Sequence, residues 1–161
     1  SGNMGKVAYD LGNVYRVVGI EPPNNSALFR ILQTPLAGIR DYKDTVSPEA
    51  LHHTHEAIDA AMAPGEFADS QASSQSARPA ADGQKSTLLA REFNFAARTL
   101  RHACYRALLA FDAPVKDSAA LDADLREIIT EHRKVWRARN RPGGLADSVA
   151  RFEKARKDYA D

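Results

Sequence analysis

The sequence predicts an all-α protein, a helical bundle of about three long antiparallel helices with two or three shorter helices packed alongside. Two observations support this fold class. Apolar residues recur at the three- and four-residue spacing of helices along most of the chain, and no window alternates apolar and polar residues as a strand does. Proline, glycine and small polar residues lie between the periodic segments, where helices begin and end.

The first half predicts three short helices. Apolar residues recur at helical spacing over residues 7–18 and stop at a glycine. Residues 24–26, Asn-Asn-Ser, offer caps for a second helix, which must end near Pro35 because proline cannot continue a helix. Residues 47–49, Ser-Pro-Glu, combine an N-cap, a proline at the first helical position and an acid at the positive helix end. They predict a third helix that ends at the Pro-Gly of residues 64–65.

The second half carries three apolar stripes. The first runs from 89 to 111 over more than six turns, and its alanines allow another helix to approach closely. The second stripe, 121–136, follows an N-cap at Asp117 or Ser118. The third, 145–159, follows a connection made of proline and two glycines. These stripes are the three long helices of the predicted bundle.

Residues 66–83 differ in composition from their surroundings. Ser, Ala, Gln, Asp and Gly make up most of the segment, and Phe67 is its only large apolar residue. Such a segment is typical of a flexible loop or hinge. We therefore expect a single helical domain over residues 1–161 that contains this loop.

Composition excludes several classes of protein. The chain is long enough for one domain, and its 43% hydrophobic and 27% charged residues are typical of a globular protein. The formal net charge of +1 gives no general attraction to nucleic acid or anionic lipid. No apolar run approaches the roughly 20 residues of a membrane span, so we expect no membrane partner.

The lone cysteine and the first residues bear on location. Cys104 excludes an internal disulfide and a cysteine-based zinc site, and it fits a reducing compartment. The chain begins Ser1-Gly2-Asn3, without a charged-then-apolar leader. We expect a cytoplasmic location, and the first residue other than Met leads us to expect a piece of a longer chain.

The third predicted helix carries a group of histidines. His52 lies at helical spacing from His55 and Glu56, and His53 is adjacent. A metal site needs three or four converging ligands, whereas two turns of one surface helix supply at most a pair. We therefore predict no metal site and interpret this group as solvated or packed against another helix.

No other pattern in the sequence predicts catalysis. His102 and Cys104 are two residues apart in a helix and face different sides, so they cannot form a nucleophilic pair. His132 lies on an apolar stripe and is predicted to be a hydrogen-bonded core residue. The chain has no adjacent Asp-Glu pair, phosphate-binding loop, dinucleotide fingerprint or serine elbow. We predict no catalytic residue and no cofactor.

The most distinctive segment is 136–148, which joins two strongly periodic helices. Cations near its start complement the negative end of a helix dipole, and Trp beside Arg is favoured at protein interfaces. Stacking of a nucleic acid on the tryptophan is disfavoured, because that residue continues the core stripe. A purely solvated face is a further alternative. The candidate interface residues are Trp136, Arg137, Arg139, Asn140 and Arg141.

Four segments together resemble a known family. Residues 136–148, with Asp-Leu-Gly-Asn-Val-Tyr at 10–15, Asn-Asn-Ser-Ala-Leu-Phe at 24–29 and Glu-Phe-Asn-Phe-Ala-Ala at 92–97, resemble the region after the catalytic barrel in some bacterial β-N-acetylhexosaminidases of glycoside hydrolase family 20. The resemblance implies an all-helical C-terminal domain. The family's adjacent Asp-Glu pair, in which Glu protonates the leaving oxygen and Asp orients the substrate's acetamido group, belongs to the barrel and is absent here.

The resemblance implies a non-catalytic accessory domain, with the barrel of the same polypeptide or a second copy in a dimer as its partner. Two alternatives stay open, a stand-alone helical protein-interaction module and, less favoured, a nucleic-acid-binding domain. Steep weakening by salt would distinguish phosphate binding from docking of an apolar face. Carbohydrate binding would need exposed aromatic platforms, for which only Tyr42, Phe67 and Tyr159 are candidates.

Overall fold

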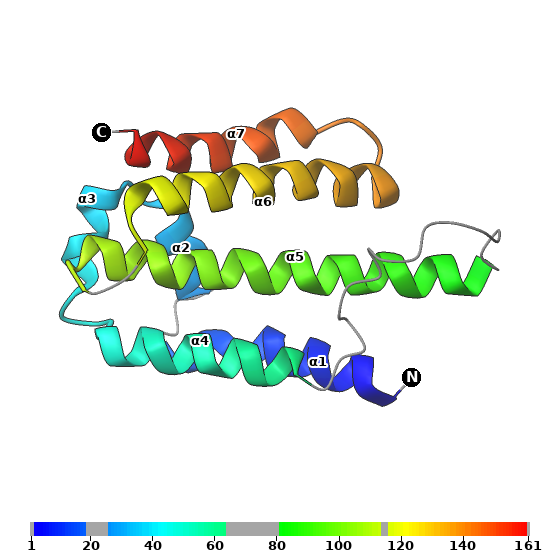
Figure 1. The fold of residues 1–161 in the computed structure, drawn as a ribbon, viewed down its shortest axis with the longest axis horizontal. Helices are drawn as coiled ribbons and strands as arrows, with labels where there is room; N and C mark the ends of the chain where they lie inside the picture. The colour runs from blue at the N-terminus through cyan, green and yellow to red at the C-terminus, as the bar shows by residue number, and fades with distance from the viewer. Residues whose placement is uncertain (1, 19–25, 64–80, 114–115, 161) are drawn as a thin grey trace.

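The computed structural model describes residues 2–18, 26–63, 81–113 and 116–160 (Figure 1). Within these ranges the chain consists of helices and turns, so the predicted all-α class is confirmed. The α-helices are α1 (Gly2–Asn13), α2 (Ala27–Gln33), α3 (Leu36–Ile39), α4 (Pro48–Met62), α5 (Ala81–Ala110), α6 (Ser118–Arg139) and α7 (Leu145–Arg156). The 3-10 turns η1 (Val14–Arg16), η2 (Arg40–Tyr42) and η3 (Lys157–Tyr159) extend α1, α3 and α7.

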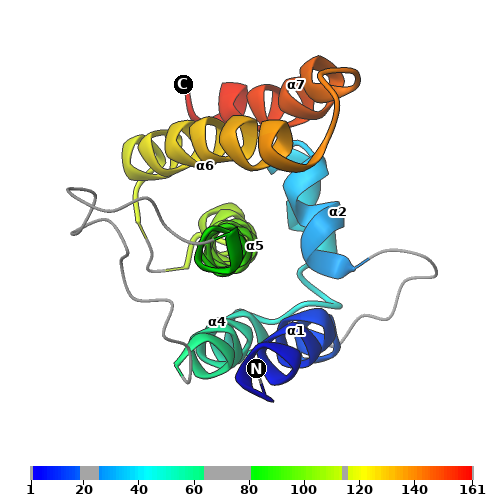
Figure 2. The same cartoon turned by 90° about the vertical axis from the view of Figure 1, so that its right-hand side faces the viewer.

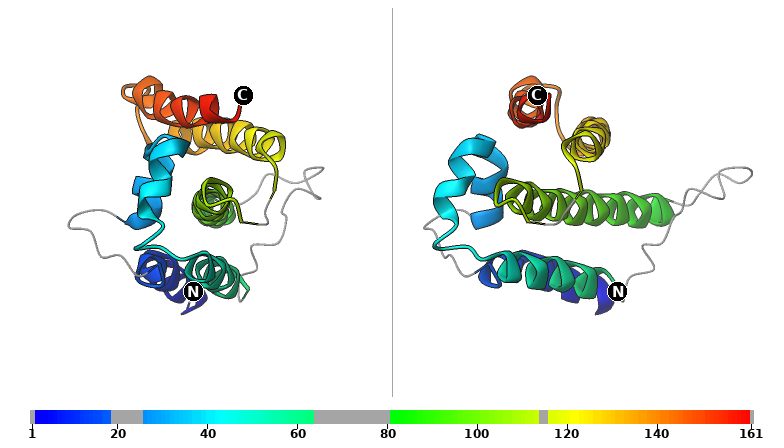
Figure 3. Two further views of the ribbon diagram at one scale, coloured as in Figure 1. Left: turned by 90° about the vertical axis from the view of Figure 1, so that its left-hand side faces the viewer. Right: turned by 60° about the vertical axis from the view of Figure 1, so that its left-hand side comes forward.

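Helix α5 lies at the centre of the molecule. It runs between a layer formed by α1 and α4 and a second layer formed by α6 and α7, with α2 along one side (Figures 2 and 3). Consecutive helices from α4 to α7 run antiparallel (Figure 1). Helices α5 and α6 have 30 and 22 residues, whereas α7 has 12. The third predicted stripe is shorter as an α-helix because its last turn, η3, is a 3-10 turn.

Helix starts follow the predicted capping residues. The Ser26 hydroxyl accepts a hydrogen bond from the Phe29 amide at 3.1 Å, and the Ser47 hydroxyl accepts one from the Ala50 amide at 3.1 Å. Of the two candidate caps for α6, Asp117 has this role, because its carboxylate accepts from the Ala120 amide at 2.8 Å. Each bond satisfies a backbone N–H that has no partner inside its helix.

Two expectations need adjustment. Helix α3 and turn η2 were not predicted, because elements this short leave no periodic pattern in a sequence. The predicted flexible loop at 66–83 falls mostly outside the described residues, and α5 already begins at Ala81, so its last three positions are helical. The predicted helix stops at residues 19 and 64–65 lie outside the described residues too.

The core has two parts, one on each side of α5. One cluster joins α5 to α1, α2 and α4, and the other lies between α6 and α7. Small residues let these layers approach α5 closely, since Ala97, Ala103, Cys104 and Ala107 are all fully buried. None of the helices in the described ranges combines the length and apolar character needed to cross a membrane.

Candidate functional site: the α6–α7 turn and two polar networks

The five predicted interface residues lie where α6 ends. Trp136, Arg137 and Arg139 belong to the last turns of α6, Asn140 is its C-cap residue, and Arg141 follows. The connection from here to α7 lies at the end of the bundle opposite the C-terminus (Figure 1). We call residues 136–144 the α6–α7 turn.

Trp136 holds this turn together from inside. Its indole Nε1–H donates to the backbone oxygen of Arg141 at 3.0 Å, and its ring meets the edge of the His132 ring at 5.6 Å between centroids. Gly144 adopts a positive φ of 81°, and a Cβ there would lie 3.5 Å from the Trp136 ring. Glycine suits this position, because it adopts a positive φ without strain and has no Cβ to press against the ring. The tryptophan therefore fixes the geometry of the turn.

Arg139 joins the turn to the central helix. Its Nε–H and Nη2–H donate to the two carboxylate oxygens of Glu92 on α5, at 2.6 and 2.8 Å. Two parallel bonds of this kind fix the position of a guanidinium group as well as binding it. The hydrogen bonds from Arg139 hold the pKa of Glu92 below its ordinary value, outweighing the opposite effect of desolvation.

The other three candidates face solvent. Arg137, Asn140 and Arg141 are exposed, and their side chains form no hydrogen bond or ion pair with any residue in the described ranges. The structure thus divides the five predicted residues into two groups. Trp136 and Arg139 brace the turn, while Arg137, Asn140 and Arg141 are presented on it.

His132 is a core residue, as predicted. It is 8% exposed, and its Nε2 lies 2.8 Å from the hydroxyl oxygen of Ser148 on α7. Phe95 stacks on the ring at 5.4 Å, and Phe152 approaches its edge at 5.2 Å. Burial, with a smaller contribution from the charge of Arg133, lowers the pKa of His132 below its ordinary value. The neutral ring therefore acts as packing between α5, α6 and α7.

The histidine group on α4 provides no metal site in the described ranges. His52 and His53 are exposed, and the Nδ1 atom of His55 lies 3.3 Å from the Asp59 carboxylate. No group of three or more His, Cys, Asp or Glu side chains is arranged to hold a metal ion in the part of the chain that the structure describes. Burial lowers the pKa of His55, whose ring packs on Tyr105 at 4.9 Å.

A buried polar network around His102 was missed by sequence reasoning. The His102 ring is fully buried, with Nδ1 2.8 Å from the Asp124 carboxylate and Nε2 2.9 Å from the Tyr159 hydroxyl. A carboxylate only accepts, so Nδ1–H donates to Asp124, and in the neutral ring Nε2 accepts from Tyr159. Arg98 completes the network by donating to Asp124 at 2.8 Å.

The environment of this network sets its ionisation. Burial acts to raise the pKa of Asp124, but the hydrogen bonds from His102 and Arg98 outweigh it and hold the pKa below its ordinary value. Burial raises the pKa of Tyr159, which is 6% exposed. The network resembles a proton relay in composition, yet its central ring, that of His102, has no contact with solvent.

A fully buried arginine lies beside this network. Arg106 donates to the backbone oxygens of Thr34 at 2.8 Å, Ala155 at 3.2 Å and Ile31 at 3.4 Å, and it pairs with Asp158. Its guanidinium carbon lies 5.3 Å from the centre of the Tyr159 ring. We call Arg106, Asp158, Tyr159, His102 and Asp124 the polar junction, which ties α2, α5, α6 and η3 together.

Burial excludes Tyr159 as a carbohydrate-binding platform and Cys104 as a nucleophile. Tyr159 cannot be the exposed aromatic platform that carbohydrate binding requires, because its ring lies in the polar junction. Tyr42 packs against the core, and Phe67 lies outside the described residues. Burial raises the pKa of Cys104 to about 12, which leaves a thiol without nucleophilic character at neutral pH.

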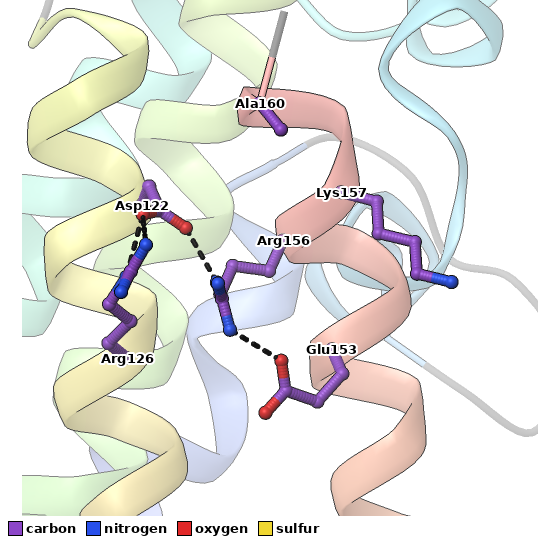
Figure 4. Close-up of a pocket in the computed structure, with 6 residues that line it drawn as sticks. All are labelled: Asp122, Arg126, Glu153, Arg156, Lys157 and Ala160. Carbon is purple, nitrogen blue, oxygen red and sulfur yellow. Dashed lines mark hydrogen bonds and ion pairs between the residues drawn. The ribbon is translucent and has the colours of Figure 1, made fainter.

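A charged pocket of about 390 Å³ lies between α6 and α7 (Figure 4). Arg126 and Arg156 both donate to Asp122 at 2.7 Å, and Arg156 also donates to Glu153 at 2.7 Å. Lys157 points away from these groups. The two arginines and two carboxylates neutralise one another, so the pocket is an ion network that joins the helices rather than a prepared ligand site.

Comparison of the chain with protein-family models, with curated proteins and with solved structures found no match.

Proposed function

We propose that the chain is a non-catalytic C-terminal helical accessory domain of a family 20 β-N-acetylhexosaminidase. It packs on the catalytic barrel of the same polypeptide or mediates dimerisation. The sequence resemblance of residues 136–148 suggests the parent enzyme. One structural observation carries the docking role: the α6–α7 turn is braced from inside by Trp136 and Arg139, while Arg137, Asn140 and Arg141 remain exposed.

This arrangement suits an interface for a physical reason. Association costs the entropy of every side chain and loop that becomes ordered, so a turn already fixed by its own contacts binds with less loss. Arginine is enriched at protein interfaces, where its planar group forms several hydrogen bonds. The buried position of His102 supports the non-catalytic part of the proposal, because its ring has no contact with solvent.

The gene tests the parentage directly. We expect the DNA upstream of the codon for Ser1 to encode a barrel that carries an adjacent Asp-Glu pair. An open reading frame that starts at or near Met4 would remove the hexosaminidase proposal. The chain alone should not hydrolyse a nitrophenyl N-acetylglucosaminide, and hydrolysis that persists through purification would contradict the non-catalytic role.

The docking role has its own test in the full-length protein. Arg137→Glu and Arg141→Glu together should lower the melting temperature or the dimer affinity, because these side chains contact the partner. The control is the pair Arg30→Glu and Lys43→Glu, which are exposed on α2 and after η2 and change the net charge equally. Equal effects of the two pairs would show that the α6–α7 turn has no special role.

A stand-alone protein-interaction module is the second candidate, and the same exposed turn favours it. It differs from the first only in its partner, which would be a separate polypeptide. Nucleic-acid binding is less well supported, because Trp136 is half-buried and contacts His132, so little of its ring is open to a base.

A further inference from the structure

Charge is strongly segregated along this chain. Residues 133–157 contain nine Lys or Arg and two Asp or Glu, which gives this segment a net charge of +7. Since the whole chain carries +1, the remaining residues carry −6. The weak total charge therefore conceals a strongly basic region formed by the last two turns of α6, the α6–α7 turn, α7 and the first residue of η3.

Part of this charge is neutralised inside the molecule. Lys134 lies 3.4 Å from Glu131, Arg133 lies 3.8 Å from Glu153, and Arg139 and Arg156 form the pairs described above. The five other cations are exposed and form no ion pair with a described residue. We call them the basic face: Arg137, Arg141, Arg151, Lys154 and Lys157.

The basic face has a defined place in the fold. Its members lie on the α6–α7 turn and along α7 and η3, in the layer farthest from α1 and α4 (Figure 2). The apolar side of α7 is occupied, since Val149 and Ala155 are buried against α6 and its neighbours. What α7 offers to a partner is therefore charge without an apolar strip.

That combination selects among anionic partners. An amphipathic helix binds a lipid surface by inserting its apolar side, which α7 has already buried in the core. Single-stranded nucleic acid needs stacking surfaces, and the exposed aromatic residues of the described ranges, Tyr9 and Phe29, lie on α1 and α2. A protein surface rich in Asp and Glu meets these conditions.

We infer that the basic face is a docking surface for a carboxylate-rich protein surface. The inference rests on the proposed accessory role and deepens it, by naming the chemistry of the surface that the barrel or dimer mate presents. It also extends the interface beyond the turn, to Arg151 and Lys154 on α7 and Lys157 on η3. Charge complementarity of this kind accelerates association and fixes the orientation of the partners.

The test uses a 20-residue poly-L-glutamate as the probe and fluorescence anisotropy as the readout. The native chain should bind it, and affinity should fall at least tenfold between 50 and 300 mM salt. The double variant Arg141→Glu/Lys154→Glu should weaken binding at least tenfold. The matched control, Arg30→Glu/Lys43→Glu, changes the net charge by the same amount outside the basic face and should weaken it less than threefold.

Several outcomes would overturn the inference. The first is no binding of poly-L-glutamate, and the second is an equal loss of affinity in the two double variants. The third is binding to an oligothymidylate of equal charge, or to anionic vesicles, that is tenfold tighter than binding to poly-L-glutamate and depends equally on Arg141 and Lys154. Circular dichroism of both variants confirms that they fold. The result does not depend on the upstream gene. If that gene encodes no barrel, the hexosaminidase proposal is removed, and binding of poly-L-glutamate still supports the docking inference.

Discussion

At the C-terminal end of α7, the fully buried Arg106 guanidinium donates to backbone oxygens and pairs with Asp158, whereas at its N-terminal end Arg137 and Arg141 extend into solvent. Both ends are rich in arginine, yet the residues serve different purposes. Inside the polar junction, every group that Arg106 meets would lose a partner if it were removed. On the α6–α7 turn, removal of the Arg137 or Arg141 side chain leaves no buried group without a hydrogen-bond partner. The same residue type thus supports the fold at one end and remains available to a partner at the other.

The largest expected effect breaks the polar junction. Arg106→Met keeps the volume but removes the Arg106 donor from the Thr34 and Ala155 oxygens and from the Asp158 carboxylate, which still accepts from the Leu36 amide. We expect a loss of about 3 kcal/mol in the free energy of unfolding, as for other buried pairs that lose one partner. The control Arg137→Met should change it by less than about 0.5 kcal/mol, as surface substitutions do. Urea titrations followed by circular dichroism would measure both, and similar losses would refute the contrast between the two ends.

A smaller effect is expected inside the same junction. Tyr159→Phe removes only the hydroxyl and leaves the Nε2 atom of His102 buried without a partner. The expected loss of unfolding free energy is about 1–2 kcal/mol. Tyr9→Phe is the matched control, because the Tyr9 side chain is 68% exposed and no such change is expected there. If the two variants unfolded at the same urea concentration, the hydrogen bond between Tyr159 and His102 would contribute nothing to the free energy of unfolding.

The next prediction concerns the α6–α7 turn. Gly144→Ala places a Cβ on a residue with a positive φ, which costs about 1 kcal/mol. Gly143→Ala is the control, since a Cβ at Gly143 would meet nothing within 4 Å and this residue has no positive φ. Differential scanning calorimetry should show a lower melting temperature for the first variant alone. A change of equal size in both would mean that the turn is not fixed at Gly144.

The last prediction is a pH dependence. The pKa of Asp124 is lower in the folded chain than the ordinary aspartate value of 3.8, so the unfolded chain binds more protons near that pH. The contribution of Asp124 is complete above pH 3.8 and is lost as the pH falls through its folded pKa. One proton of difference changes the free energy by about 1.4 kcal/mol per pH unit. Unfolding of the native chain and of Asp124→Asn between pH 6 and pH 2 should show a weaker acid dependence in the variant, and parallel curves would contradict it.

Local signals in the sequence predicted much of the fold. The caps at Ser26 and Ser47 and the apolar stripes of α5 and α6 involve residues close together in the chain, so spacing reveals them. His132 was predicted correctly for the same reason, because its place on a stripe implied burial. These features depend on a few neighbouring residues and follow from the geometry of a helix.

The polar junction could not be predicted in this way. His102 is separated from Tyr159 by 57 residues, and Arg106 from Asp158 by 52, so no local spacing brings them together. The only available signal was a histidine and an arginine four residues apart on a long helix. At the α6–α7 turn the candidate residues were identified, but the division between bracing and exposed side chains depends on Glu92, which belongs to another helix. Whether the exposed residues bind a partner stays a prediction.

The position of Cys104 gives the molecule a built-in reporter. Its single thiol is fully buried on α5, between the two helical layers. An alkylating reagent therefore reacts only when the layers separate, and the rate of labelling measures how often this happens. The added mass appears once per molecule, so a mass spectrum of the intact protein separates labelled chains, which have opened at least once, from unlabelled ones. A comparison with and without a bound partner would then show how far docking at the outer layer stabilises the centre of the molecule.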